Sequence, residues 1–282
     1  MIVDIHSHVP THRDSIPEDE YVENAKWRPD RVVAATTTWA EYDEAFAGID
    51  VSVAFTIARD RSEVDSELNN RVAEFVATAP ERRIGFMSVH PEVAGAEDEL
   101  ERCRTDLELK GVKLGPNYQI FDPLGAPAKR IYELAERYGL PMLFHQGASP
   151  VREAPLRYAH PLLMDEIAME FPELRIVMAH MGHPWQRDTI VTIRKHPHVY
   201  ADVSALFYRP WSFYEGLRLA TEWGALEKLL FGSDFPIATP AETIEGLRRV
   251  NEPIRGTALP PVPLDAIEEL IHRNPLPLLG LG

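Results

Sequence analysis

The sequence predicts a single (β/α)8 barrel of the α/β class, slightly elaborated by a long insertion after its first strand. Three observations support this prediction. Eight short runs of β-branched and apolar residues alternate with longer amphipathic stretches, which is typical of parallel strands joined by helical crossovers. The length of 282 residues fits one barrel domain spanning residues 1–282. Polar residues also recur where these runs end, and active sites of such barrels lie at the carboxyl ends of the strands.

The strand candidates are Ile2–His8, Val51–Ala58, Ile84–His90, Gly111–Pro116, Pro141–Gly147, Arg175–Gly182, Val199–Ala205 and Leu229–Pro236. A doubly wound open sheet is the alternative arrangement, and it usually carries a glycine-rich fingerprint after its first strand. That place is taken here by His6, Ser7 and His8, so the closed barrel is favoured.

Helical periodicity fills the stretches between strands. The helix candidates are Glu67–Thr78, Ala128–Tyr138, Leu162–Phe171 and Trp211–Trp223. The second of these stops at Gly139, shortly before Pro141. Thr239, Pro240 and Glu242 form a helix-start signature, with a threonine cap and a proline in the first turn.

Two long segments interrupt this alternation. The segment Pro10–Ala47 is long for one connection, and such insertions after barrel strands usually shape the substrate mouth. A structural flap packed on the barrel rim is the alternative. The aromatic residues of this insertion are Tyr21, Trp27, Trp39 and Tyr42. The proline-rich segment Pro253–Pro263 predicts an ordered or semi-rigid loop before a last helix.

Charge and composition restrict the partners. The formal net charge of −15 repels nucleic acid and anionic membranes, so we expect a small-molecule substrate and, as is common in such barrels, possible homo-oligomers. Neither a signal peptide nor an apolar run of ~18 residues is visible, which predicts a cytoplasmic protein. The single cysteine, Cys103, cannot form an internal disulfide, and its charged neighbours predict a helix surface.

The first strand candidate carries the first chemical signal. His6 and His8 are two residues apart on a strand, so they point to the same face, which in a barrel can be the interior. Neutral imidazoles that converge there suit Zn, Fe, Mn or Ni. Such a pair alone is weak evidence, because two ordinary histidines would give the same spacing.

The other strand ends strengthen this interpretation. The polar residues that follow or end the later strand candidates are His90, Lys113, His145, His180, His183, Ser204 and Asp234. Buried imidazole and charge are costly without partners, so a purely structural role does not explain so many of them. Three imidazoles and one carboxylate could hold a divalent ion. Such an ion lowers the pKa of a bound water molecule, which makes hydroxide available near neutral pH. His180 could orient the water or relay a proton, and Asp234 could accept one.

The motifs IVDIHSH, LKGVKLGPNYQIFDP, YGLPMLFHQG, MAHMGHPW and LLFGSDFP together resemble the amidohydrolase superfamily. They are most similar to its TIM-barrel branch of metal-dependent hydrolases, which also includes aminocarboxymuconate semialdehyde decarboxylase and the resorcylate decarboxylases. The resemblance runs from Ile2 to the C-terminus, with the motifs in the family's order. It implies a single divalent ion, zinc first with manganese or iron as alternatives. The implied metal ligands are His6, His8, His145 and Asp234, and the implied catalytic or substrate-contacting residue is His180.

Lys113 matches a lysine of the family's fourth-strand motif. In binuclear members a lysine at this strand end is carboxylated and bridges two metals, although this branch tends to be mononuclear. Binding of a substrate carboxylate and a salt bridge within the barrel are the other roles considered. The chain departs from the family in its last turn, where Asn274–Leu279 replaces an Asn-Ala-x-x-Leu-Phe-like helix.

A metal-dependent hydrolase of a small carboxylated substrate, such as a lactone or an amide, is the first functional prediction. The alternatives are a metal-dependent non-oxidative decarboxylase of an aromatic or muconate-type acid, a metal-free lactonase, and a non-catalytic binding barrel. Lys113 and Arg59 are candidate partners of a substrate carboxylate, because cationic side chains suit such groups. Tyr118 and Trp185 are candidate apolar walls of the substrate site, and His183 is a further candidate for its lining.

Overall fold

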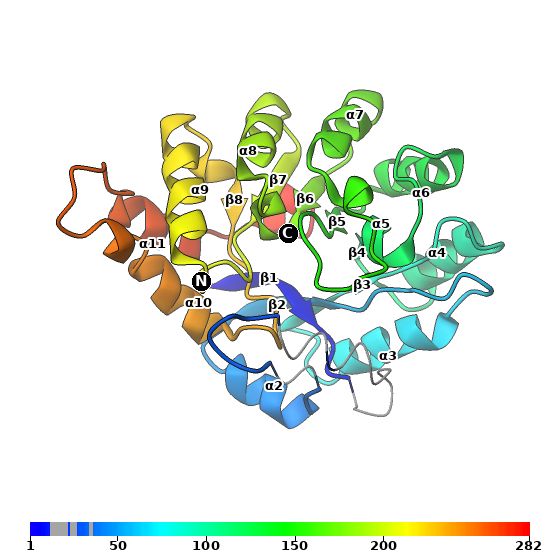
Figure 1. Cartoon of the computed structure of the whole chain (residues 1–282). Helices are drawn as coiled ribbons and strands as arrows, with labels where there is room; N and C mark the ends of the chain where they lie inside the picture. The colour runs from blue at the N-terminus through cyan, green and yellow to red at the C-terminus, as the bar shows by residue number, and fades with distance from the viewer. Residues whose placement is uncertain (12–21, 23–26, 34–35) are drawn as a thin grey trace.

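The computed structural model describes residues 1–11, 22, 27–33 and 36–282 of the chain. Its eight parallel strands follow one another around the sheet in sequence order, from β1 to β8 (Figure 1). The strands are β1 (Val3–His8), β2 (Val51–Phe55), β3 (Arg83–Met87), β4 (Gly111–Leu114), β5 (Met142–Phe144), β6 (Ile176–Met178), β7 (Val199–Asp202) and β8 (Leu229–Leu230). All eight strand predictions are therefore confirmed, although most strands end before the predicted run does.

Backbone hydrogen bonds between the first and last strand regions close the barrel. The Ile5 amide donates to the carbonyl of Phe231 at 3.1 Å, and the Asp234 amide donates to the carbonyl of His6 at 2.8 Å. The His8 amide donates to the Phe235 carbonyl at 2.9 Å. Closure removes the exposed sheet edges, and it brings residues from opposite ends of the chain into register.

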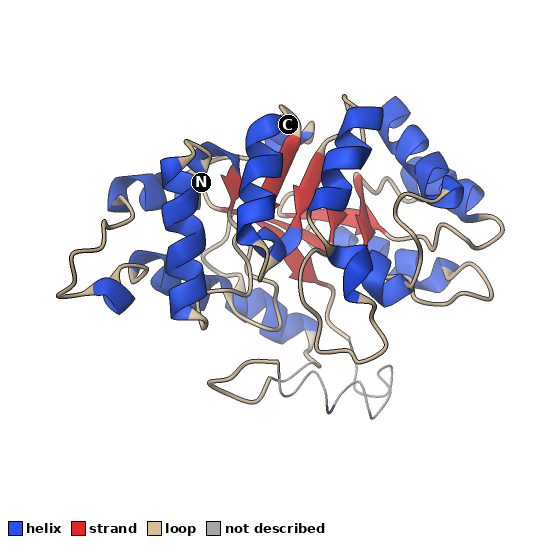
Figure 2. Ribbon diagram, turned by 45° about the horizontal axis from the view of Figure 1, so that its top comes forward, coloured by secondary structure: helices blue, strands red, loops and turns tan. Residues whose placement is uncertain are grey.

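The helices surround the strands as an outer layer (Figure 2). They are α2 (Trp39–Ala45), α3 (Ser66–Ala77), α4 (Ala96–Thr105), α5 (Pro116–Gln119), α6 (Ala126–Tyr138), α7 (Leu162–Glu170), α8 (Gln186–Lys195), α9 (Pro210–Glu222), α10 (Pro240–Arg248), α11 (Leu264–His272) and α12 (Leu276–Leu279). The helix start predicted at Thr239 is confirmed as the start of α10, where Thr239 and Glu242 also form a capping box because each bonds the other's backbone amide. The predicted stop of α6 is confirmed at Gly139, which has a φ of 67°.

A register shift in β1 decides which side chains face the barrel interior. Asp4 pairs with Ser52 and Ser7 with Ala54, so β1 carries one residue more than β2 over this stretch. Such a bulge interrupts strict alternation. Ile5 and His6 both lie within the shifted stretch: Ile5 joins the apolar cluster formed by residues of the other strands, and His6 meets Asp234 at the carboxyl end of the barrel. At the opposite end, leucines of α12 and its flanks pack against that cluster.

The described part of the insertion serves both of the roles considered for it. Tyr42 of α2 is fully buried, stacks on Phe46 with ring centroids 4.0 Å apart and packs at the edge of Phe75. Trp27 instead lines the large cavity described below. The insertion therefore contributes to the core and to the mouth of the barrel, whereas Tyr21 lies outside the described residues.

The prediction of a surface position for Cys103 is wrong. The thiol is buried on the inner side of α4 and donates to Glu99 Oε1 at 3.2 Å. Burial and the negative charge of Glu99 raise the pKa of the thiol, which keeps it protonated and unreactive. The helix predicted after the proline-rich loop is α11, and the short α12 follows it. Among the described residues, no helix is both long and apolar enough to span a bilayer.

Candidate active site

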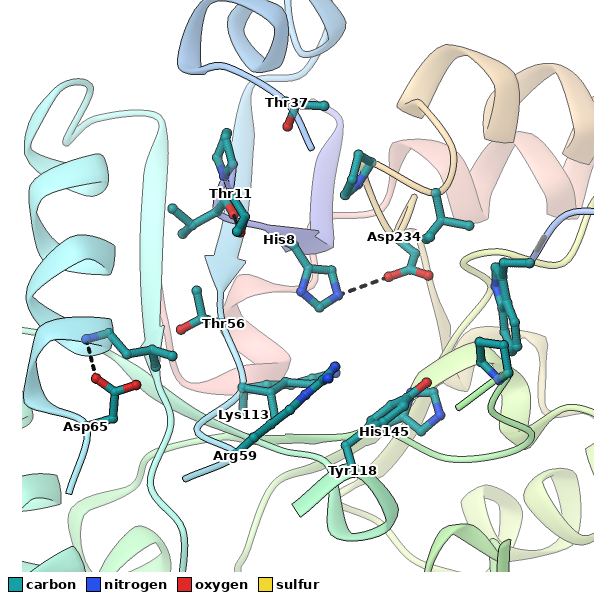
Figure 3. A pocket seen from close by; sticks show the side chains of 18 of the residues that line it. His8, Thr11, Thr37, Thr56, Arg59, Asp65, Lys113, Tyr118, His145 and Asp234 are labelled. Atoms are coloured by element: carbon teal, nitrogen blue, oxygen red, sulfur yellow. Dashed lines mark hydrogen bonds and ion pairs between the residues drawn. The ribbon is translucent and has the colours of Figure 1, made fainter. Parts of the chain in front are cut away.

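A cavity of about 710 Å³ opens at the carboxyl ends of the strands. Side chains that reach it from four different strand ends include His8, Lys113, His145 and Asp234, and His180 lines it as well. Figure 3 shows the pair His8–Asp234 on one side of this space. The size lies in the range of ligand pockets for small molecules.

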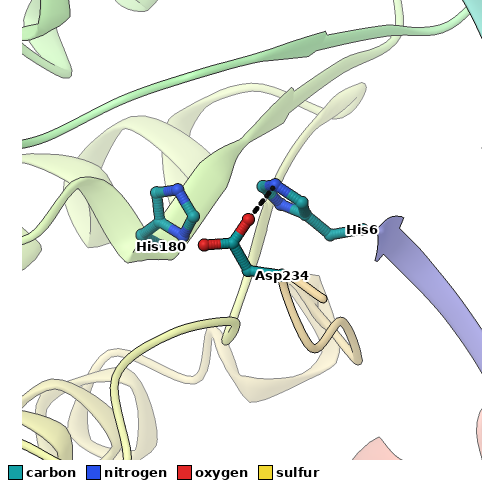
Figure 4. A group of neighbouring side chains, drawn as sticks. All are labelled: His6, His180 and Asp234. Atoms are coloured by element: carbon teal, nitrogen blue, oxygen red, sulfur yellow. Dashed lines mark ion pairs between the residues drawn. The ribbon is translucent and has the colours of Figure 1, made fainter. Parts of the chain in front are cut away.

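Three buried side chains form the group best suited to hold a cation within the described part of the chain. One potential ligand atom from each of His6, His180 and Asp234 lies within 4.8 Å of the others (Figure 4). Two of the four ligands implied by the family resemblance are in this group. The third member is His180, for which the resemblance implied a catalytic or substrate-contacting role.

Local backbone geometry aims these side chains at one another. His6 lies within the bulge of β1, and Asp234 is fixed by the hydrogen bond from its amide to the His6 carbonyl. Asp234 has a φ of 65° and His180 a φ of 56°, a left-handed conformation that is uncommon outside glycine. Such conformations cost free energy and cluster at functional sites, so the two strand ends are shaped around this group.

The protonation pattern fits a bound cation. Nε2 of His6 is buried without a hydrogen-bond partner and lies 3.2 Å from Oδ1 of Asp234. Burial disfavours a charged His6, but the negative charges of Asp202 and Asp234 outweigh burial and raise the pKa of His6. Positive charge is therefore favoured at this position. A divalent ion between the imidazole nitrogen and the carboxylate would satisfy both acceptors.

The other two histidines of the predicted ligand set lie beside this group. Nε2 of His8 is also 3.2 Å from Oδ1 of Asp234, and the half-buried His8 side chain faces the cavity. The ring of His145 lies 5.0 Å from that of His180, and its buried Nε2 has no hydrogen-bond partner. Burial, with repulsion from His180 and Lys113, holds the pKa of His145 well below its usual range. Both rings are thus available as neutral ligands.

Asp202 and Ser204, for which no role was predicted, contact the Nδ1 atoms of the two histidines. Asp202 Oδ2 lies 2.7 Å from Nδ1 of His6, and Ser204 Oγ lies 2.8 Å from Nδ1 of His180. Burial opposes ionisation of Asp202, but attraction to His6 and the hydrogen bonds of His6 and Ser204 keep its pKa well below the usual range. As polar residues at the carboxyl end of a predicted strand, both could have been recognised as site candidates. The sequence did not show which side chains they contact.

Lys113 brings a positive charge into the cavity. Its ammonium lies 4.5 Å from the centre of the Phe55 ring, and among the described residues no side chain accepts a hydrogen bond from it. Burial lowers the pKa of Lys113 to about 8, against the attraction of Asp234 and Asp202. Lys113 is therefore charged near neutral pH and can bind an anionic group.

Arg59 and Tyr118 form the wall next to Lys113. The Arg59 guanidinium lies 5.1 Å from the centre of the Tyr118 ring, and that ring lies 4.5 Å from His145 (Figure 3). Buried Gln119 holds the loops that carry them: its amide group donates to the carbonyls of Ala58 at 2.7 Å and of Val89 at 2.9 Å. The wall is thus anchored to the loops after β2 and β3.

The structure brings most predicted substrate-binding residues together, but not all. Lys113, Arg59 and Tyr118 line the cavity, whereas His183 and Trp185 are not among its lining residues. His183 bonds the Gln186 side chain at 2.9 Å, and Trp185 packs against His160 with ring centroids 5.0 Å apart.

Comparison with known proteins places the chain among enzymes of one superfamily. The model of the amidohydrolase family matches residues 3–281. A zinc-bound amidohydrolase from Burkholderia multivorans has a similar fold, with 14% identity, a TM-score of 0.68 and coverage of 100% of both chains. A probable 2-pyrone-4,6-dicarboxylic acid hydrolase from Acinetobacter baumannii, solved with citric acid, has 17% identity, a TM-score of 0.67 and coverage of 99% of both chains.

A dihydroxybenzoic acid decarboxylase from Polaromonas, solved with manganese and 2-nitroresorcinol, is similar to the same extent. Its identity is 17% and its TM-score 0.66, and the match covers 99% of this chain and 97% of that one. The same barrel therefore occurs in proteins named for hydrolysis and in proteins named for decarboxylation.

Proposed function

The chain belongs to the amidohydrolase family, and on that premise we propose that it is a metal-dependent hydrolase of a small carboxylated substrate, such as a lactone or a cyclic amide. The observation that carries the proposal is the buried group of His6, His180 and Asp234 beside the cavity. The volume of the cavity and the net charge of −15 favour a small molecule over nucleic acid as the partner.

We propose that His6, His180 and Asp234, with His8 and His145 as neighbouring ligands, hold one divalent ion. When bound, the ion would lower the pKa of a water molecule, to ~7 in zinc enzymes, and polarise the bond under attack. Imidazole and carboxylate ligands suit zinc as the first choice, with manganese or iron as alternatives. The zinc and manganese in the two solved structures support a divalent metal without selecting one.

Asp234 is the proposed proton acceptor. Its Oδ1 faces Nε2 of both His6 and His8, and its other oxygen is turned toward His180 (Figure 4). The carboxylate is ionised, because attraction to His6 and His180 outweighs burial and keeps its pKa well below the usual range. Asp234 can therefore accept the proton of the attacking water, and His180, with a pKa lowered by burial to about 4, acts as a neutral ring that orients it.

The two cationic side chains in the cavity favour a carboxylated substrate. Lys113 and Arg59 enter the cavity across from His8 and Asp234 (Figure 3). A substrate carboxylate bound by these two side chains would leave the rest of the molecule beside Tyr118 and within reach of Asp234. Charge complementarity thus fixes the orientation of the substrate before reaction.

Non-oxidative decarboxylation is the second candidate, and it is favoured by the likeness to the dihydroxybenzoic acid decarboxylase. The same cations would hold the leaving carboxylate, and a proton from water, relayed by Asp234, would go to the carbon that carbon dioxide leaves. The two reactions differ in their products rather than in the residues that they require.

The proposal is tested by metal analysis of the purified protein, followed by turnover of lactones, amides and aromatic acids in ¹⁸O-labelled water. Hydrolysis places ¹⁸O in a product carboxylate. Decarboxylation releases carbon dioxide and leaves the organic product without ¹⁸O. We expect about one metal equivalent, and its loss in the double variant His6→Ala/His8→Ala but not in the control Asp165→Asn, whose half-buried carboxylate pairs with Lys195 outside the cavity lining. Turnover that persists without metal would favour the metal-free lactonase. If the reconstituted protein shows no bound metal and no turnover, the proposal is contradicted and a binding barrel is favoured.

A further inference from the structure

Behind the proposed metal site lies a fully buried pair, Asp202 and Ser204, that does not line the cavity. Asp202 is the last residue of β7, and Ser204 follows two residues later. Together they contact both histidines of the buried group at Nδ1, the ring nitrogen that faces away from Asp234 in His6. The pair is therefore placed to act on the histidines and not on a substrate.

The hydrogen bonds of Asp202 fix where the protons lie. Its Oδ1 accepts from the backbone amides of His180 at 2.9 Å and Ser204 at 3.0 Å, so this oxygen is an acceptor. The Ser204 hydroxyl, 2.5 Å from the same oxygen, must then donate its only proton to it. With that proton engaged, Ser204 Oγ can only accept from His180, and Nδ1 of His180 must carry a hydrogen.

The second oxygen of Asp202 acts on His6 in the same way. Oδ2 lies 2.7 Å from Nδ1 of His6, which therefore donates to the carboxylate. Ser204 Oγ lies farther from that nitrogen, at 3.3 Å, so the bond to Asp202 dominates. In the neutral state, each ring then keeps an unprotonated Nε2.

We propose that Asp202 and Ser204 are positioning residues that hold His6 and His180 in the Nδ1–H tautomer, so that both rings present Nε2 to one cation together with Asp234. This inference rests on the metal site of the proposed function and names the residues that prepare it. Only an unprotonated nitrogen can bind a metal, so the tautomer is a condition of binding.

The two residues act on different rings, which predicts a separation of effects. In Asp202→Asn, the two backbone amides keep the carbonyl oxygen at the Oδ1 position, and the amide nitrogen replaces Oδ2. That nitrogen donates to Nδ1 of His6 and forces its proton to Nε2, while His180 keeps its acceptor in Ser204. In Ser204→Ala, His180 loses its close acceptor at 2.8 Å and keeps only the backbone carbonyl of residue 204, 3.4 Å from Nδ1, while His6 keeps Asp202.

The experiment measures both tautomers by ¹⁵N NMR of histidine-labelled protein at mildly alkaline pH, without metal and with zinc. The resonances are assigned with His6→Gln and His180→Gln variants. We expect Nδ1–H on both rings in the unaltered protein, a switch of His6 alone in Asp202→Asn and mixed tautomers of His180 alone in Ser204→Ala. Zinc affinity, measured against a chromophoric chelator, should fall roughly 10- to 100-fold in each variant. Ser88→Ala, another buried serine whose hydroxyl bonds the Ala58 amide, is the matched control and should change neither signal.

Unchanged tautomers in both variants, or a switch of both rings in Ser204→Ala, would overturn the inference. Loss of zinc affinity in the control to the same degree would also overturn it, because general loosening of the barrel would then explain the data. If the unaltered protein binds neither zinc nor manganese but shows the expected tautomers and their separation, the positioning pair stands and the proposed metal-dependent reaction fails. Circular dichroism of each variant confirms that it is folded.

Discussion

Burial acts on two opposite charges in the cavity with different results. It disfavours the ionised forms of both Asp234 and Lys113. Asp234 is compensated by His6 and His180, whereas Lys113 receives only partial compensation from Asp234 and Asp202. Lys113 is thus a cation near the proposed metal site whose ammonium remains available to a substrate.

Replacement of Lys113 by methionine tests this role. Methionine keeps most of the buried length but removes the charge, so we expect KM for a carboxylated substrate to rise about 10- to 100-fold, the loss of about 1.5–3 kcal/mol expected for a charged hydrogen bond. Metal content and thermal stability should change little. Metal content is measured beside steady-state kinetics. A fall from two metal equivalents to one would instead identify Lys113 as a bridging ligand.

At the scale of elements, the loops after β5 and β6 pack backbone against backbone. Gly147 has a φ of 100°, and a Cβ there would lie directly against the carbonyl oxygen of His183 and 2.9 Å from the carbonyl carbon of Gly182. The Ala148 amide donates to the same His183 oxygen at 2.6 Å. This close approach fixes the distance between the segments that carry His145 and His180.

Gly147→Ala should therefore separate the two histidine loops. We expect a loss of about 2–4 kcal/mol in the free energy of unfolding from left-handed strain and displaced backbone, with weaker zinc binding. Chemical denaturation and zinc titration measure the two effects. Gly48→Ala is the control, because no atom lies within 4 Å of the added Cβ, and its effect should stay within ~0.5 kcal/mol. Unchanged zinc affinity in Gly147→Ala would show that the loops tolerate separation.

Helices α3 and α4 are joined by the buried carboxylate of Glu99. It accepts hydrogen bonds from Arg102, Asn69, Cys103 and Ser66. Burial would raise the pKa of Glu99, but these hydrogen bonds, Arg102 first, lower it to about 2. The ionised form is thus bound more tightly in the folded state than in the unfolded chain, where a glutamate titrates near ~4.3.

The stabilisation by Glu99 should depend on pH with a definite sign. A folded-state pKa below the unfolded value gives stability that is present above pH ~4.3 and is lost as the pH falls toward 2. Glu99→Gln should therefore lower the free energy of unfolding by about 1–2 kcal/mol at neutral pH. Urea denaturation from neutral pH down to the acid limit of the fold should show the two proteins converging. A difference that stays constant with pH would contradict the assignment.

At the scale of the whole molecule, the proposed metal site joins the two ends of the chain. His6 lies on β1, and Asp234 lies directly after β8, the strand that closes the barrel. A ligand that binds only the folded barrel raises its stability by mass action, by about 4 kcal/mol at a free concentration of 1,000 times Kd. Metal binding and barrel closure are therefore expected to be coupled.

Thermal unfolding should report this coupling. We expect the midpoint to rise by roughly 8–16 °C with saturating zinc, at ~2–4 °C per kcal/mol for a chain of this size, and to return to the metal-free value with excess chelator. Asp234→Asn should abolish the response, since it removes a charged ligand. Differential scanning calorimetry measures the shift. An equal rise in Asp234→Asn would place zinc elsewhere on the protein.

Local patterns in the sequence were sufficient to predict the periodic features of the fold. Strand and helix patterns predicted all eight strands, and the capping residues Thr239 and Gly139 predicted where helices begin and end, because these signals are local. Parallel strands in sequence order also imply that their carboxyl ends meet, so a site that includes His6, His8, His145, His180 and Asp234 could be predicted. The role of each member of that site remains a prediction to be tested.

How those residues meet depends on contacts between distant parts of the chain. The bulge in β1 depends on pairing with β2, and the left-handed conformations of His180 and Asp234 depend on the loops around them. Asp202 gained its contact with His6 through closure of the barrel, and the contacts of His183 and Trp185 with Gln186 and His160 left both outside the cavity lining. Contacts between residues almost 200 positions apart, such as His6 and Asp202, leave no periodic signal in a single chain, because packing in three dimensions creates them.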